Sequence, residues 1–318
     1  MTLVIQEALM AAGAALLQAV GLLAVAPLLK TVIKKMKARL QNRQGPPLLQ
    51  GYYDLAKWFG KEAVRSETAS WIYVAGPRVY FAAALAATTL VPVVFAAAPL
   101  EAAGGILLLV GTLAFGRFAL ATAALDTGSP FGGMGASRDM TIAALAEPAL
   151  MLGLFASALA AGSMNLGVLI RTLLHGGIAL HPSDMLAFAG LFMIVVAETG
   201  RIPVDNPATH LELTMIHEAM VLEYAGPDLA LVEWASAVKE LLYLTLLAGL
   251  FMPVGMATTT APAALLVGFL AWTGKVFALA IAVTLVESTN AKLRLFRVPE
   301  LVAISLGLAF LALAIRFL

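Results

Sequence analysis

Long apolar segments constrain this chain more than any other feature. Eight of them can be recognised, covering residues 8–29, 79–98, 106–125, 140–161, 182–197, 241–257, 261–286 and 301–318. A helix of about 20 apolar residues crosses a hydrocarbon layer about 30 Å thick, and it bonds all its backbone groups internally, as that layer requires. The pattern predicts an all-α integral membrane protein with about eight transmembrane helices and long cytoplasmic loops, in a single domain over residues 1–318.

The overall composition agrees with a membrane protein. Hydrophobic residues make up 61% of the chain and charged residues 12%, whereas a soluble domain has about 45–50% and about 25%. These values exclude a soluble enzyme, a nucleic-acid-binding module and a disordered protein. The chain contains no cysteine, so it has no thiolate metal site and no cysteine-ligated iron–sulfur cluster of its own.

Lysine and arginine are concentrated on one side of the predicted membrane. Most of the 20 lie in the segments 30–78, 126–139, 198–240 and 287–300, which join odd-numbered to even-numbered apolar segments. Loops rich in these residues stay in the cytoplasm, so both termini are predicted outside the inner (cytoplasmic) membrane. Because the long loops all face the cytoplasm, we expect the protein to present a folded surface to partners there.

The first long loop combines charge with aromatic residues. Residues 30–37 are rich in lysine, and anchoring to anionic lipid is one explanation for them. A Gly-Pro-Pro turn follows at 45–47, and then Asp54, Lys57 and Lys61 at helical spacing predict a short ion-paired face beside aromatic side chains. Such a surface is typical of a protein-docking site, and the candidate docking residues are Arg39, Arg43, Gln50, Asp54, Lys57, Lys61 and Glu62.

A glycine-rich segment, LDTGSPFGGMGASRDM, lies between the third and fourth apolar segments. It lacks the lysine of a P-loop and the glycine spacing of a dinucleotide site, and no strand precedes it. We therefore expect a tight loop that re-enters the membrane rather than a nucleotide site.

Ionisable residues inside the apolar segments are functional candidates, because a charge in hydrocarbon is costly. Glu147 lies in the middle of the fourth segment, Lys275 within the seventh, and Glu287 directly after it. The alternative is that Glu147 forms only a structural ion pair, with Arg117, Arg138 or Lys275.

The loop at residues 198–226 is the richest in acids. It has one basic residue, Arg201, and five acids interleaved with apolar side chains: Glu198, Asp205, Glu212, Glu218 and Glu223. Half-buried carboxylates have raised and mutually coupled pKa values, as a proton relay near neutral pH requires; a solvated acidic loop is the alternative. His210 and His217 with Glu212 match no specific metal motif, so we predict no metal site.

These motifs resemble the subunit 1/H family of respiratory complex I and its hydrogenase relatives. Residues 39–62 are similar to the family's first cytoplasmic loop, and Glu198-x2-Arg201-x-Pro203-x-Asp205 with Glu223-Tyr224-x-Gly226 to its second. LDTGSPFGGMGASRDM and DNPATHLELTMIHEAMVLEYAG are similar to the branch of membrane-bound, energy-converting nickel–iron hydrogenases, which includes hydrogenase-4 and formate hydrogenlyase. Residues 204–217 depart from the acidic run of quinone-using members, which argues against quinone binding.

The resemblance implies eight transmembrane helices and a membrane component of an oxidoreductase complex, without a redox centre of its own. It would seat hydrogenase-like large and small subunits, which carry nickel–iron and iron–sulfur centres, and link electron transport to proton or sodium translocation in antiporter-like membrane subunits. The candidate proton path comprises Glu147, Glu198, Asp205, Glu212, Glu218, Glu223, Lys275 and Glu287, with Arg117, Arg138, Arg201 and Lys239 as charge partners. The alternatives are a quinone-pocket subunit of an NADH:quinone-type oxidoreductase and, from another class, a stand-alone ion transporter.

Overall fold

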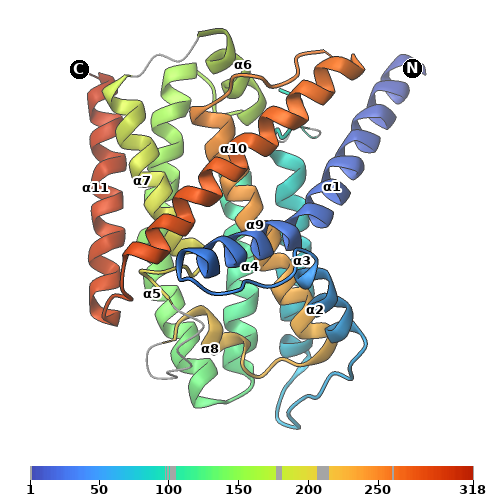
Figure 1. Ribbon diagram of the computed structural model, residues 1–318, viewed down its shortest axis with the longest axis vertical. Coiled ribbons are helices and arrows are strands. Elements are labelled where there is room, and N and C mark those ends of the chain that lie inside the picture. Colours follow the sequence, from blue (N-terminus) through green and yellow to red (C-terminus); the bar gives the residue numbers. More distant parts are fainter. Residues whose placement is uncertain are drawn as a thin grey trace.

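The computed structural model describes residues 2–96, 98, 100, 105–176, 181–205, 215–259 and 261–317. The named elements within these ranges are all helices (Figure 1). In chain order they are α1 (Thr2–Leu40), α2 (Gln50–Phe59), α3 (Trp71–Leu90), α4 (Ile106–Asp126), α5 (Pro130–Ala161), α6 (Leu166–Gly176), α7 (Pro182–Glu198), α8 (His217–Val221), α9 (Gly226–Phe251), α10 (Pro262–Thr289), the 3-10 turn η4 (Leu295–Arg297) and α11 (Val298–Phe317).

Six helices in the described part of the chain are long and apolar enough to cross a membrane: α1 from Leu16 onward, α4, α5, α9, α10, and α11 with η4. The predicted all-α integral membrane architecture is therefore confirmed. The predicted number of about eight crossings is not, because the other two segments form α3, which carries Arg78, and α7, which has only 17 residues. Both chain ends lie at the same end of the helix bundle (Figure 1); the side of the membrane that they face stays a prediction.

Two predicted loops are helical instead. The glycine-rich segment is not a re-entrant loop: α5 begins at Pro130 and continues without a break to Ala161. Proline at the first helical position has its φ angle already set for a helix, and Gly135 allows α8 to approach, since a Cβ there would lie 2.8 Å from Ala219 Cβ. Residues 226–240, expected in a cytoplasmic loop, form the first half of α9.

Helix α9 is the centre of the bundle. Its most apolar 18-residue window is 83% buried, against 39%, 33% and 28% for the corresponding windows of α1, α10 and α11. It packs against α1, α3, α7 and α10, while α5, α7 and α11 form a second packed group. In Figure 1, α10 crosses the front of the bundle obliquely. A polar side chain on α9 therefore faces protein, whereas most of α10 faces outward.

Helix α1 changes direction along its length (Figure 1). Pro27 lies inside it, and a proline removes one backbone hydrogen bond and bends the helix. Helix α2 packs at this bend: the Gly51 N–H donates to Thr31 Oγ1 at 3.1 Å, and a Cβ on Gly51 would lie 2.7 Å from the Pro27 carbonyl oxygen. The bend thus holds the basic second half of α1 beside α2 and α9.

Candidate functional site: buried clusters of charged side chains

Arg117, in the middle of α4, is surrounded by carboxylates. Its guanidinium forms ion pairs with Glu198 at the end of α7, with Glu147 of α5 (Nη1 to Oε1, 3.4 Å) and with Asp139 of α5 (Nε to Oδ2, 3.6 Å). Lys239 of α9 lies 2.9 Å from the same Glu198 oxygen. We call these five residues the Arg117 cluster; they come from four helices.

Burial makes the pairing within the Arg117 cluster energetically important. Arg117, Asp139, Glu198 and Lys239 are each 6% exposed or less, and the Tyr243 hydroxyl donates a further bond to Glu198 at 3.2 Å. Desolvating a charge costs several kcal/mol unless partners compensate it. Two cations against three carboxylates give near compensation, so the charge state of any one member depends on the others.

A second group, the Arg201 cluster, lies where α7, α9, α10 and α1 meet. Arg201 holds both oxygens of Glu240 (2.5 and 2.7 Å) and one of Glu287 (3.2 Å), and Lys37 lies 3.7 Å from Glu287. Burial lowers the pKa of Arg201, but Glu240 and Glu287 outweigh that effect and leave its pKa above the usual value. A guanidinium in this bidentate geometry stays charged and fixed in orientation.

Asp205 connects the chain on the two sides of residues 206–214. Its carboxylate accepts the backbone N–H groups of Ile216 (3.0 Å) and His217 (3.2 Å) and lies 3.0 Å from Lys292 Nζ. His217 in turn places Nε2 3.1 Å from Asp139 Oδ1. The start of α8 is therefore linked by side-chain contacts to the Arg117 cluster.

These groups border one large hollow, which we call the charged cavity. Its volume is about 400 Å³. Its walls come from α1, α7, α8, α9 and the ends of α10 and the first loop, and the acids and bases along them include Lys30, Lys34, Lys37, Arg43, Glu198, Arg201, Asp205, His217, Glu218, Glu233, Lys239, Glu240 and Glu287. Burial, with Glu233 nearby, raises the pKa of the Glu218 carboxyl in α8. Such a space can hold ions or water among titratable groups.

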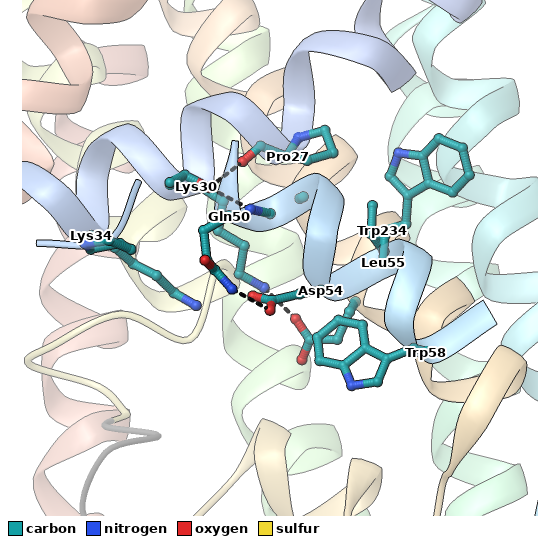
Figure 2. A pocket seen from close by; sticks show the side chains of 13 residues that line it. Pro27, Lys30, Lys34, Gln50, Asp54, Leu55, Trp58 and Trp234 are labelled. Atoms are coloured by element: carbon teal, nitrogen blue, oxygen red, sulfur yellow. Dashed lines mark hydrogen bonds and ion pairs between the residues drawn. The ribbon is translucent and has the colours of Figure 1, made fainter. Parts of the chain in front are cut away.

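A smaller hollow of about 160 Å³, the aromatic pocket, adjoins the charged cavity. Figure 2 shows Lys30 and Lys34 reaching from α1 toward Gln50 and Asp54 of α2, with Trp58 and Trp234 at the other end. The Lys30 ammonium lies 2.6 Å from Glu233. Both hollows share Lys30, Lys34, Pro46 and Glu233 as wall residues, so the aromatic pocket joins the charged one at its polar end.

Most members of the predicted proton path meet in these clusters. Glu147 and Glu198 belong to the Arg117 cluster, Glu287 to the Arg201 cluster, and Asp205 and Glu218 line the charged cavity. The alternative for Glu147, a pair with Arg117, is the contact observed. Among the predicted charge partners, Arg117, Arg201 and Lys239 pair with carboxylates, whereas Arg138 donates to the Met215 carbonyl at 2.8 Å.

Three predicted path residues lie elsewhere. Glu223 is exposed, and its backbone carbonyl accepts the Tyr73 hydroxyl at 2.7 Å. Lys275 is half-buried on α10 and has no charged partner within 4 Å among the described residues. Glu212 lies outside the described residues, as does His210 of the metal alternative.

Sequence reasoning missed Asp139, Glu240 and the role of His217. Asp139 precedes Glu147 by eight residues, about two helical turns, so both lie on one face of a helix. That spacing was a usable signal, but the glycine-rich segment was assigned to a loop, which concealed it. Glu240 follows Lys239 directly, and no periodicity distinguishes it from a loop acid.

The docking candidates are mostly at the surface. Arg39, Arg43, Lys57, Lys61 and Glu62 are exposed. The expected ion-paired face does not form, because α2 ends at Phe59 and leaves Lys61 beyond it. Asp54 instead accepts the Gln50 amide at 2.8 Å, and both line the aromatic pocket.

The fold and the clusters define a class: a multi-pass membrane protein whose helices enclose charged groups around a cavity. A family model described as NADH dehydrogenase matches residues 12–317. The chain belongs to this family, as its motifs predicted.

Relatives place the chain within one part of the family. It is 34% identical to formate hydrogenlyase subunit 4 of Escherichia coli (strain K12) over 297 residues, covering 93% of this chain and 96% of the relative. It is 32% identical to hydrogenase-4 component C of the same strain, with 94% and 93% covered. The H-type membrane component of NADH-quinone oxidoreductase from Burkholderia vietnamiensis is more distant, at 28% identity, with 70% and 65% covered.

The fold also occurs in a solved complex. A chain of the membrane-bound sulfane sulfur reductase, an archaeal respiratory membrane complex, superposes with a TM-score of 0.82 at 20% identity, covering 95% of this chain and 98% of that one. At this identity the likeness concerns the fold alone.

Proposed function

We propose that this protein is a non-catalytic coupling subunit of a membrane-bound, energy-converting hydrogenase-type complex. In this role it seats the peripheral redox subunits on its cytoplasmic loops and links their electron transfer to proton or sodium translocation in neighbouring membrane subunits. The relatives named formate hydrogenlyase subunit 4 and hydrogenase-4 component C support the type of complex. The observation that carries the coupling role is the Arg117 cluster, which lies inside the bundle beside the charged cavity.

The coupling step follows from electrostatics. Two unit charges 4 Å apart interact by about 4 kcal/mol at an effective dielectric constant of 20. A charge that appears in the cavity when an attached subunit is reduced therefore changes the proton affinity of wall carboxylates by several factors of ten. Glu198 transmits this change, because it borders the cavity and also holds Arg117 and Lys239. In this proposal partner subunits hold the nickel–iron and iron–sulfur centres, and no quinone is needed.

The test uses the purified complex in sealed vesicles, with ionophores that dissipate either a proton or a sodium gradient. Glu147→Gln keeps the shape of the side chain and its contact with Arg117 but removes titration. We expect electron transfer to a soluble acceptor to continue and ion translocation to fall to background. Normal translocation by this variant would make Glu147 a purely structural partner of Arg117.

Docking has its own readout. Reversing the charges of the exposed Arg43, Lys57 and Lys61 should release the peripheral subunits during purification, while the membrane part stays inserted. If the complex co-purifies intact, the first loop does not seat those subunits.

One observation favours the alternative of a quinone-pocket subunit. The aromatic pocket has an apolar end, formed by Leu55, Trp58 and Trp234, and a polar end that opens to the charged cavity. This arrangement would suit an amphipathic ring compound. Quinone-dependent turnover of the purified complex, inhibited by substitution of Trp234, would favour this alternative over the hydrogenase role.

A further inference from the structure

His217 occupies a position that the coupling role has not yet used. It is the first residue of α8, and its ring lies between two buried carboxylates of different segments. Nε2 is 3.1 Å from Asp139 Oδ1 on α5, and Nδ1 is 4.0 Å from Asp205 Oδ2. Asp139 is 2% exposed and Asp205 1%, whereas the His217 side chain is 26% exposed and lines the charged cavity.

The backbone fixes this arrangement on both sides of the ring. The Asp205 carboxylate holds the N–H groups of Ile216 and His217, which anchors the start of α8. Gly135, one helical turn before Asp139, lets α8 approach α5 so closely that a Cβ would lie 3.0 Å from the Ile216 carbonyl oxygen. The His217–Asp139 contact is therefore set by two independent features, one in each partner element.

Two atoms of this contact have unused hydrogen-bonding capacity. Asp139 Oδ2 and His217 Nδ1 are buried and have no hydrogen-bond partner among the described residues. Buried polar atoms are nearly always bonded, and exceptions often mark functional positions. Asp139 Oδ2 also lies 3.6 Å from Arg117 Nε, so the path from His217 leads directly into the Arg117 cluster.

We propose that His217 transfers protons between the charged cavity and Asp139, and through Asp139 to the Arg117 cluster. This inference rests on the proposed coupling function and identifies the entry point of its proton path. Histidine suits the step because its ring gains and loses a proton between about pH 5 and 8 and has one nitrogen on each side. Neither His217 nor Asp139 belongs to the acidic path predicted from the sequence.

The transfer balances without any further reactant. A proton from the cavity binds Nδ1 of the neutral ring, and the Nε2 proton passes to the Asp139 carboxylate, which becomes neutral. When Asp139 gives its proton onward, the ring is left with its proton on Nδ1. Rotation about Cβ–Cγ or loss of that proton to the cavity then restores the starting state.

Several charges surround the ring and set the pH at which it titrates. Asp139 faces it from α5 and Asp205 from the loop after α7, and both favour the protonated ring. Glu218 is its neighbour in α8. The remaining charges act through these carboxylates, and they are Arg117 of α4, Lys239 of α9 and Lys292 before η4.

The experiment uses the intact complex in sealed vesicles, with ion translocation measured from pH 5.5 to 8.5 and electron transfer to a soluble acceptor measured in parallel. His217→Gln should reduce translocation by about 100-fold, the typical contribution of one positioned acid–base group, while electron transfer changes less than about twofold. His175→Gln is the matched control, since His175 is exposed on α6 and bonds only the Arg171 carbonyl.

Chemical rescue separates proton transfer from structure. His217→Gly leaves space at the cavity wall, so added imidazole should restore translocation, and the pH dependence should follow the pKa of the imidazole derivative used. If His217→Gly does not assemble, His217→Asn or His217→Gln with a full pH profile decides the matter. Normal translocation with an unchanged pH profile in an assembled variant would overturn the inference. If the wild-type complex itself translocates no ion, the proposed function fails instead.

Discussion

Lys239 and Lys275 lie in membrane-spanning helices and differ in almost every other respect. Lys239 lies in α9, is 5% exposed and contacts Glu198 and the face of the Tyr243 ring. Lys275 lies in α10, is half-buried and has no charged partner within 4 Å among the described residues. The difference comes from the helices: α9 is surrounded by other helices, whereas α10 covers one side of the bundle. A charge in an apolar segment is thus a weak guide to function until its helix is placed in the bundle.

The largest effect is expected where the buried cluster loses its shared cation. Arg117→Gln leaves Asp139 and Glu198 buried with only Lys239 and His217 nearby. Removing one partner of a buried ion pair costs about 3–5 kcal/mol, so we expect this protein to be lost from purified complexes. Quantitative immunoblotting of the membrane fraction measures this. Wild-type abundance would mean that the cluster is not a structural centre.

A smaller effect is expected for the two lysines, and it tests the comparison directly. Lys239→Met leaves Glu198 paired with Arg117, so the loss is that of one charged hydrogen bond, about 1.5–3 kcal/mol, and translocation should stop. Lys275→Met removes an isolated charge from an outer helix and should change thermal stability by less than about 0.5 kcal/mol. Melting temperature and vesicle translocation are compared for both. Equal effects would show that Lys275 also takes part in the path.

The smallest effect concerns Glu218 and the pH dependence of stability. Burial raises the pKa of its carboxyl in the folded protein above the value of about 4.5 expected when unfolded. The folded state then binds the proton more tightly, so this group favours folding at low pH, and that contribution is lost as pH rises through the folded pKa. Glu218→Gln should therefore melt at a higher temperature than wild type at pH 8, and the difference should disappear toward pH 4. A difference independent of pH would contradict this account.

The apolar segments were sufficient to predict the fold class, because only helices and closed barrels satisfy the backbone in hydrocarbon. The motifs were also long enough to predict the family. Their reading failed where a helix continues beyond the membrane, as in α5 and the first half of α9. A glycine-rich or charged segment has low helix propensity by itself, and only packing against neighbours makes it helical.

The sequence by itself determined that this chain is a helical membrane protein with acids between its apolar segments, since hydrophobicity and charge depend on residue type alone. Only the tertiary structure decided which charges meet. Arg117, Asp139, Glu198 and Lys239 come from four helices and touch only when those helices pack. Pairing at a few ångströms depends on helix rotation and crossing, which a single sequence does not encode in any local pattern. The same physics separated Lys239 from Lys275 and placed His217 against Asp139.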